Sequence, residues 1–399
     1  MSLLVVSDHR LPLCVAVTFR PLFSRLNNLM QSLPSPEECH FDAKGTTAWT
    51  LLLDAEQEAL VTSTSDQPRH GTSLIAIRVL GFLLKDLWDN AQRWNLGDTA
   101  YLRLVKEISC TCKGDKEVLF NDLVHLGVRY RNCISRVFSS NADSELGFTM
   151  SSDEGSPPAV NPLQERIIQG MTVKSAPTTQ YEIKQQALLR DGCKCVVTGV
   201  IDYDAWRQLG LGKMPEKPMS MTQVAYLFSE SAQHGSKESP TSLFAFLTMF
   251  GLAHKANSLY SGAVNSLDNV ITLEATMHQL FDTFDLWLEP VEGQEHTYDV
   301  CGPAAHPQCN FGGGPLPSRI VFKVDPSAEA KAAEHNVTLN LPDPHLIAIR
   351  AICARVANMS GAIEQLRQIL SSLEDLVEGT DFADNGCMAA LLAMCLTKI

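Results

Sequence analysis

Three polar side chains with useful chemistry lie in apolar segments near the middle of the chain. Tyr226 stands in TQVAYLFSES, Asn269 in NSLDNVITL and His278 in HQLFD. A histidine can bind a divalent cation, and an asparagine amide can hydrogen-bond backbone across a loop. A phenol, with a reference pKa of about 10, is a poor general base at neutral pH. Taken alone, His278 is as consistent with a structural histidine as with a metal ligand.

The surrounding sequence predicts the elements that would hold these side chains. Residues 222–228 predict a short strand, residues 264–273 a turn that ends in a strand, and residues 274–284 a helix. A further helix is expected over 239–252, between the two strands. Upstream, a helix over 181–190 and a strand over 195–199 are expected to lead into this unit.

These segments resemble the core of fungal HNH endonucleases. The resemblance rests on VAYLFSE, which is similar to an AH(I/L)F-type segment, on N-x-x-x-N followed by ITL, and on H-x-x-F-D. The stretches FDLWLEPVEGQEHTYDV and LPDPHLIAIRAICARVANMSGAIEQ extend it over roughly residues 165–375. The resemblance implies an α+β protein with a ββα-metal (HNH-like) core and extensive helical N- and C-terminal flanks.

The resemblance also implies a role for each polar side chain. His278 matches the helix histidine and is the candidate ligand of a single divalent ion, Mg²⁺, Mn²⁺ or Zn²⁺. Asn269 matches the middle residue of the motif, which orients the base or the cation. Asn265 fills a second asparagine position, for which turn formation is the simpler interpretation. Tyr226 stands at the end of the first strand, where the family carries the histidine that activates water.

The departure at Tyr226 leaves three functions open. General-base assistance contributes about 10²- to 10⁴-fold, so metal-dependent phosphodiester hydrolysis would persist in a weakened or altered form. Replacement of the base by His234, His254 or Glu230 is a further variant of this hypothesis. The second function is a catalytically inactive pseudonuclease that acts as an interaction module. The third is a cleft reused for small-molecule chemistry, with Tyr226 as an acid or hydrogen-bond donor.

Composition and apolar periodicity predict four regions along the 399 residues. They are a mainly helical region over 1–140, a Ser-, Pro- and Gly-rich linker over 141–176, a region with strands over 177–325 that the resemblance identifies as the HNH-like core, and a C-terminal helical region over 326–399. Within them we expect helices over 73–94, 101–109 and 116–139, strands over 286–290, 296–300 and 319–324, and helices from Pro344 and from Asn385. Residues 1–19 are expected to be a packed strand rather than a signal peptide. Arg355 is expected to snorkel or to pair with a carboxylate rather than to contact phosphate.

The net charge of the chain helps to judge which kinds of partner it binds. The formal net charge is -13, and no run of basic residues marks a face for phosphate. A nucleic-acid partner is therefore compatible with the resemblance but is not supported by net charge, while a protein partner at the helical flanks stays open. The basic residues from Lys184 to Lys217, Arg190 among them, are interleaved with acidic ones and predict a solvated mixed-charge surface.

The cysteines and the hydropathy indicate the compartment. Twelve cysteines are scattered through the chain, and the two C-x-C pairs do not have the spacing of a zinc ribbon. We therefore expect reduced thiols and an intracellular protein, cytoplasmic or nuclear. No segment reaches the roughly 20 apolar residues that cross a bilayer, so no membrane insertion is expected.

Overall fold

The computed structural model describes residues 31–63, 68–111, 115–138, 168, 171–173, 177, 179–208, 219–228, 242–306, 309, 311 and 315–367. The strand expected over 1–19, the helix expected from Asn385 and most of the linker over 141–176 lie outside these residues. So do Glu230 and His234.

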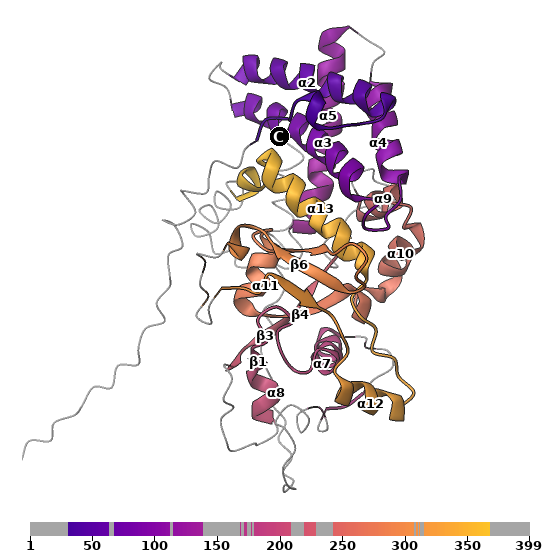
Figure 1. Ribbon diagram of the computed structural model, residues 1–399, viewed down its shortest axis with the longest axis vertical. Helices are drawn as coiled ribbons and strands as arrows, with labels where there is room; N and C mark the ends of the chain where they lie inside the picture. Colours follow the sequence, from indigo (N-terminus) through magenta and orange to yellow (C-terminus); the bar gives the residue numbers. More distant parts are fainter. Residues whose placement is uncertain are drawn as a thin grey trace, which may run out of the picture.

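Helices and small sheets alternate along an elongated molecule, with the N-terminal helices at one end (Figure 1). The N-terminal helices are α2 (Ala43–Ser63), α3 (Pro68–Asn90), α4 (Thr99–Cys110) and α5 (Lys116–Phe138). The last three were expected from their apolar repeats, whereas α2 was not. Helix α3 is buried over most of its surface because α2, α4, α5 and the C-terminal helix all pack on it.

Helix α13 (Pro344–Ser360) joins the N-terminal helices to a three-stranded sheet. Its start is fixed by the Asp343 side chain, which caps the backbone N–H groups of His345 and Leu346, and its end by Gly361 in the left-handed conformation (φ 82°). The helix packs on α3 and on β5. The sheet has the antiparallel order β5 (Trp287–Pro290), β6 (Thr297–Cys301), β7 (Arg319–Val321).

Arg355 of α13 connects the helical end to this sheet. Its guanidinium lies 2.7 Å from Asp86 of α3 and 2.8 Å from Glu289 of β5. It also lies 4.4 Å from the ring centroid of Trp94. The expected carboxylate pairing of Arg355 is therefore present, with two carboxylates rather than one.

A second sheet holds the candidate residues. Strands β3 (Thr222–Tyr226) and β4 (Val270–Glu274) pair antiparallel, with Tyr226 opposite Val270, and α11 (Ala275–Asp282) follows β4 directly. Both strands and the helix lie within a residue or two of the expected positions. The chain between the strands forms α9 (Leu243–Met249), α10 (Ala253–Ser258), the π-helical η3 (Leu259–Ala263) and η4 (Leu267–Asn269). The remaining elements are η1 (Pro36–Glu38), α7 (Gln180–Arg190), β1 (Ile201–Asp202), α8 (Tyr203–Gln208), β2 (Met219–Ser220), η5 (Pro303–Ala305) and α12 (Pro326–Glu334).

The strand expected over 195–199 is a turn instead. Gly199 has a φ of 72°, and its N–H donates to the Cys195 carbonyl at 2.9 Å. Only one isolated bridge, Lys194 to Ile201, forms nearby. The composition of residues 195–199 favours a strand, but a glycine that adopts a positive φ reverses the chain here.

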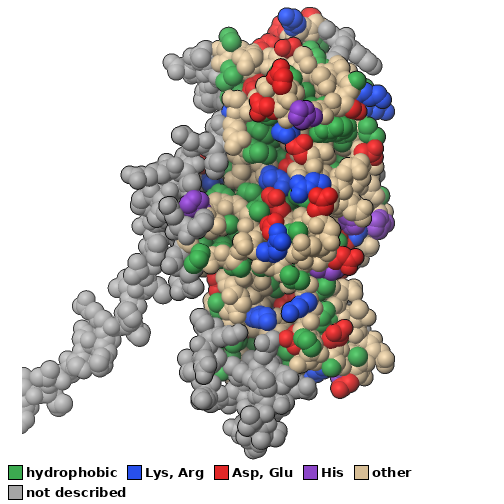
Figure 2. Space-filling model, viewed as in Figure 1, with side chains coloured by type: hydrophobic (Ala, Val, Ile, Leu, Met, Phe, Trp, Pro, Cys, Tyr) green, Lys and Arg blue, Asp and Glu red, His purple; other side chains and the backbone are tan. Residues whose placement is uncertain are grey.

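Arg190 was expected on a solvated mixed-charge surface, and this prediction is wrong. Its side chain is fully buried, pairs with Asp191 at 2.7 Å, and donates to the carbonyls of Leu267 at 2.6 Å and Val270 at 2.9 Å. It therefore ties the end of α7 to the start of β4. Elsewhere, the face drawn in Figure 2 carries basic and acidic side chains interspersed.

Two apolar clusters lie on opposite faces of the β3–β4 sheet. The larger runs from Leu33 through the N-terminal helices to α11 and α13, and includes Ala225 and Ile271. The smaller contains Ile183 and Val270, with Tyr226 packed against it. Among the described residues, none of the helices has the length and apolarity needed to span a membrane.

Candidate functional site

The alternation of strand β3 separates the candidate residues. Successive side chains of a strand point to opposite faces, so Gln223 and Ala225 share one face while Val224 and Tyr226 share the other. Helix α11 covers the first face, because its His278 contacts Gln223. The sheet thus holds His278 and Tyr226 on different sides.

His278 is buried, with 4% of its side chain exposed, and both ring nitrogens face side-chain oxygens. Nδ1 lies 2.5 Å from Gln223 Oε1, and Nε2 lies 3.3 Å from Asp282 Oδ2. An amide oxygen can only accept, so Nδ1 carries the proton. Burial lowers the pKa of His278; the Asp282 charge opposes this effect and the Arg350 charge adds to it. The neutral imidazole then presents Nε2 as an acceptor toward the carboxylate.

Two acceptors facing each other fit a shared divalent cation. Zinc is bound by histidine nitrogen and carboxylate oxygen at about 2.0–2.2 Å, so two such ligands at a tetrahedral angle lie roughly 3.3 Å apart. The observed separation of Nε2 and Oδ2 is 3.3 Å. The hydrogen bond from Nδ1 to Gln223 is the kind of outer contact that orients a metal-binding imidazole.

The described residues place two candidate ligands, His278 and Asp282, at this point. Position 225, two residues after Gln223 on the same face of β3, holds an alanine that is fully buried. In the part of the chain that the structure describes, no group of three or more His, Cys, Asp or Glu side chains could hold a metal. An ion held by His278 and Asp282 would therefore keep water in its remaining positions.

Arg350 of α13 supports the end of α11. Its guanidinium is buried, donates to the carbonyls of Leu227 at 3.1 Å and Phe281 at 2.9 Å, and lies 3.6 Å from Asp282 Oδ1. It also stacks over the Phe281 ring, 4.0 Å from the centroid. Burial lowers the pKa of Arg350 to about 10, and the Asp282 charge opposes this effect. Arg350 thus fixes the strand end and the carboxylate with one planar group.

Asn269 closes the loop that follows β3. Its side-chain oxygen accepts from Phe228 N–H at 3.1 Å, and its side-chain nitrogen donates to the carbonyls of Phe228 at 2.8 Å and Val264 at 3.1 Å. The side chain is almost fully buried. Asn269 therefore contacts backbone on both sides of the loop, and no contact of its side chain with His278 is found among the described residues.

Tyr226 is paired with the second asparagine. Its hydroxyl donates to Asn265 Oδ1 at 2.7 Å, and its ring is half-buried against the smaller cluster. A phenol that donates its proton keeps that proton, which is the wrong state for a general base. His254, considered as a replacement base, is exposed on α10.

Sequence reasoning gave no site role to three residues that surround His278. Asp282 belongs to the H-x-x-F-D segment, and a carboxylate four positions after a histidine shares its helix face. Gln223 and Arg350 carry no such signal, because no spacing rule links a glutamine in a strand or an arginine in an apolar helix to His278. Only the packing of β3, α11 and α13 brings them to the imidazole.

Comparison with known proteins finds a family match in this region. Residues 195–289 match the family model described as HNH endonuclease. No curated protein and no solved structure matches the chain. The matched range contains β3, β4 and α11, and it supports an HNH nuclease-like domain that occupies less than half of the chain.

Proposed function

We propose that β3, β4 and α11 form a ββα-metal site of the HNH type, which binds one divalent cation through His278 and Asp282 and cleaves phosphodiesters weakly. The observation that carries the proposal is the 3.3 Å separation of His278 Nε2 and Asp282 Oδ2, two acceptors turned toward each other in a buried setting. The family match over residues 195–289 supports the substrate class, which is nucleic acid.

The residues around the ligand pair have separate tasks in this proposal. Gln223 holds the imidazole with its proton on Nδ1, so that Nε2, which faces Asp282, would be the atom that binds a cation. Arg350 holds Asp282 and the end of β3 in place. A bound Mg²⁺, Mn²⁺ or Zn²⁺ ion would polarise the phosphodiester and stabilise the leaving oxygen.

Tyr226 supplies no general base to the His278 and Asp282 pair, because its side chain lies on the other face of the sheet. Its hydroxyl donates a hydrogen bond to Asn265 and stays protonated, so it does not take a proton from water. The loss of general-base assistance costs about 10²- to 10⁴-fold in rate. Asn269 acts as a positioning residue, because its three backbone contacts fix the loop that begins after Tyr226.

A pseudonuclease is the second candidate, and Arg350 favours it. Its permanent charge lies 3.6 Å from Asp282 Oδ1 and already offsets that carboxylate, which weakens attraction for a second cation. The net charge of -13 also disfavours phosphate. In this alternative the hairpin and helix keep their fold and serve as an interaction module.

Nicking of supercoiled plasmid by the full chain in Mg²⁺, Mn²⁺ or Zn²⁺ tests the proposal. We expect slow, cation-dependent nicking that is lost in His278→Ala and kept in His335→Ala, a control at an exposed histidine that follows α12. Tyr226→His tests whether a histidine at the end of β3 reaches the cation from the other face of the sheet: acceleration toward the 10²- to 10⁴-fold that a general base contributes would show that it does, and unchanged nicking that it does not.

Two other results would change the conclusion. Nicking by Tyr226→His alone, with none by the native protein, would establish the pseudonuclease. Absence of nicking from the native protein and from Tyr226→His, with every cation, would reject phosphodiester hydrolysis.

A further inference from the structure

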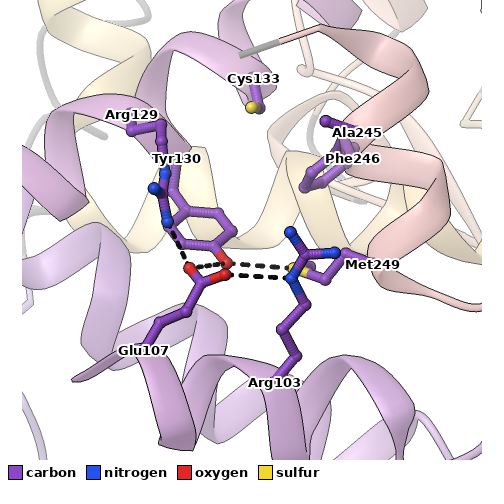
Figure 3. A pocket seen from close by; sticks show the side chains of 8 residues that line it. All are labelled: Arg103, Glu107, Arg129, Tyr130, Cys133, Ala245, Phe246 and Met249. Carbon is purple, nitrogen blue, oxygen red and sulfur yellow. Dashed lines mark hydrogen bonds and ion pairs between the residues drawn. The ribbon is translucent and has the colours of Figure 1, made fainter. Parts of the chain in front are cut away.

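A groove between α4 and α5 lies outside the HNH-like domain and has a volume of about 960 Å³. Its lining includes Leu102, Arg103, Lys106 and Glu107 on α4 and Asp122 and Arg129 on α5. At one end a small pocket lined by Tyr130, Phe246 and Met249 brings α9 against the same wall (Figure 3). The groove is therefore bounded by the N-terminal helices and by the insertion between β3 and β4.

The wall of the groove is held by one carboxylate. Glu107 accepts from Arg103 Nε at 3.0 Å and from the Tyr130 hydroxyl at 2.9 Å, and it pairs with Arg129 (Figure 3). The Tyr130 hydroxyl also lies 3.2 Å from Met249 Sδ. Arg103 and Arg129 carry two positive charges against the one negative charge of Glu107, so this cluster has a net positive charge. Its ion pairs and hydrogen bonds also hold the wall of the groove in place.

Basic and apolar side chains of the groove lining are exposed next to one another. Side chains of Arg103 and Arg129 are 45% and 34% exposed, and Lys106 is exposed with no ion pair to any described residue. Leu102, one turn before Lys106 on α4, is 45% exposed. An exposed apolar residue beside charged residues of the same helix face suits the binding of an amphipathic helix.

We propose that this groove binds an acidic amphipathic helix of a partner protein. Carboxylates of that helix would meet Lys106 and Arg103, and its apolar side chains would cover Leu102. Charge complementarity selects this occupant, because the chain as a whole carries a net charge of -13 while the groove has three basic and two acidic side chains. Nucleic acid fits less well, because a phosphate backbone carries a charge at every nucleotide and would also meet Asp122 and Glu107, whereas a helix can place its carboxylates opposite the basic side chains alone.

Selection from a displayed library of helical peptides tests the proposal on the full chain. The peptides have about 20 residues, which is enough for three helical turns or more. We expect enrichment of peptides that combine Asp or Glu with Leu or Ile at helical spacing. Anisotropy with a labelled enriched peptide should show binding that weakens about three- to tenfold in Lys106→Glu and in Leu102→Ser, and that falls with added salt.

Matched controls on α2 separate the groove from general surface effects. Lys44→Glu changes an exposed lysine and Val61→Ser an apolar residue that is 73% exposed, and neither lines the groove. Both should bind the peptide as the native protein does, with unchanged melting temperatures in all four variants. Failure to enrich any acidic peptide, binding that is insensitive to Lys106 and Leu102, or stronger capture of DNA or RNA at the groove would overturn the proposal.

Discussion

Arg350→Met should lower the free energy of unfolding by about 3–5 kcal/mol, the range for removing one partner of a buried ion pair. The substitution removes the donors to the Leu227 and Phe281 carbonyls and leaves Asp282 without its guanidinium neighbour. It also removes the contact with the Phe281 ring. Urea unfolding followed by circular dichroism measures the effect.

Arg319→Ala is the control for this substitution. Arg319 pairs with Asp299 at 2.7 Å, but both side chains are more than two-fifths exposed. Exposed pairs contribute about 0–1 kcal/mol, so the control should stay close to the native protein. A loss in Arg350→Met no larger than in Arg319→Ala would show that Arg350 does not hold α11 and β3 together.

Asn269→Ala is expected to cost about 2–4 kcal/mol. Each buried polar group left without its partner costs about 1–3 kcal/mol, and Asn269 serves three backbone groups, the N–H and carbonyl of Phe228 and the carbonyl of Val264. Relaxation of the loop would recover part of this cost. Thermal and urea unfolding measure the change.

Asn265→Ala provides the comparison within the same loop. Asn265 accepts from Tyr226 at a half-buried position, so its loss should cost less than the loss of Asn269. Equal effects of the two substitutions would contradict the clamp role of Asn269. A purely catalytic Asn269 would leave the free energy of unfolding unchanged and alter nicking alone.

Local patterns predicted the elements of the site better than its contacts. The strand at β3, the helix at α11 and the helices α3, α4 and α5 follow from apolar spacing, because each buries one or more faces in the core. Helix α2 was missed, and the expected strand over 195–199 became a turn at Gly199. A short apolar run does not reveal a chain reversal when the deciding feature is one backbone dihedral.

The contacts of the candidate site come from tertiary packing. The sequence indicated His278, and its spacing to Asp282 was available, but the pairing of His278 with Gln223 depends on which face of β3 meets α11. Arg350 reaches the site from α13, which follows the three-stranded sheet in the sequence. No local spacing rule links residues that meet only after three elements have packed.

Calorimetric titration of the metal-free full chain with Zn²⁺ tests the central claim most directly. We expect one equivalent to bind, with affinity reduced at least about tenfold in His278→Ala and in Asp282→Asn, and reduced about 10- to 100-fold in Gln223→Ala, as for other outer contacts of metal-binding histidines. His345→Ala is the control, because His345 lies 3.5 Å from Asp343 in a similar pair outside the site. Binding that survives His278→Ala unchanged, or no binding by the native protein, would contradict the account.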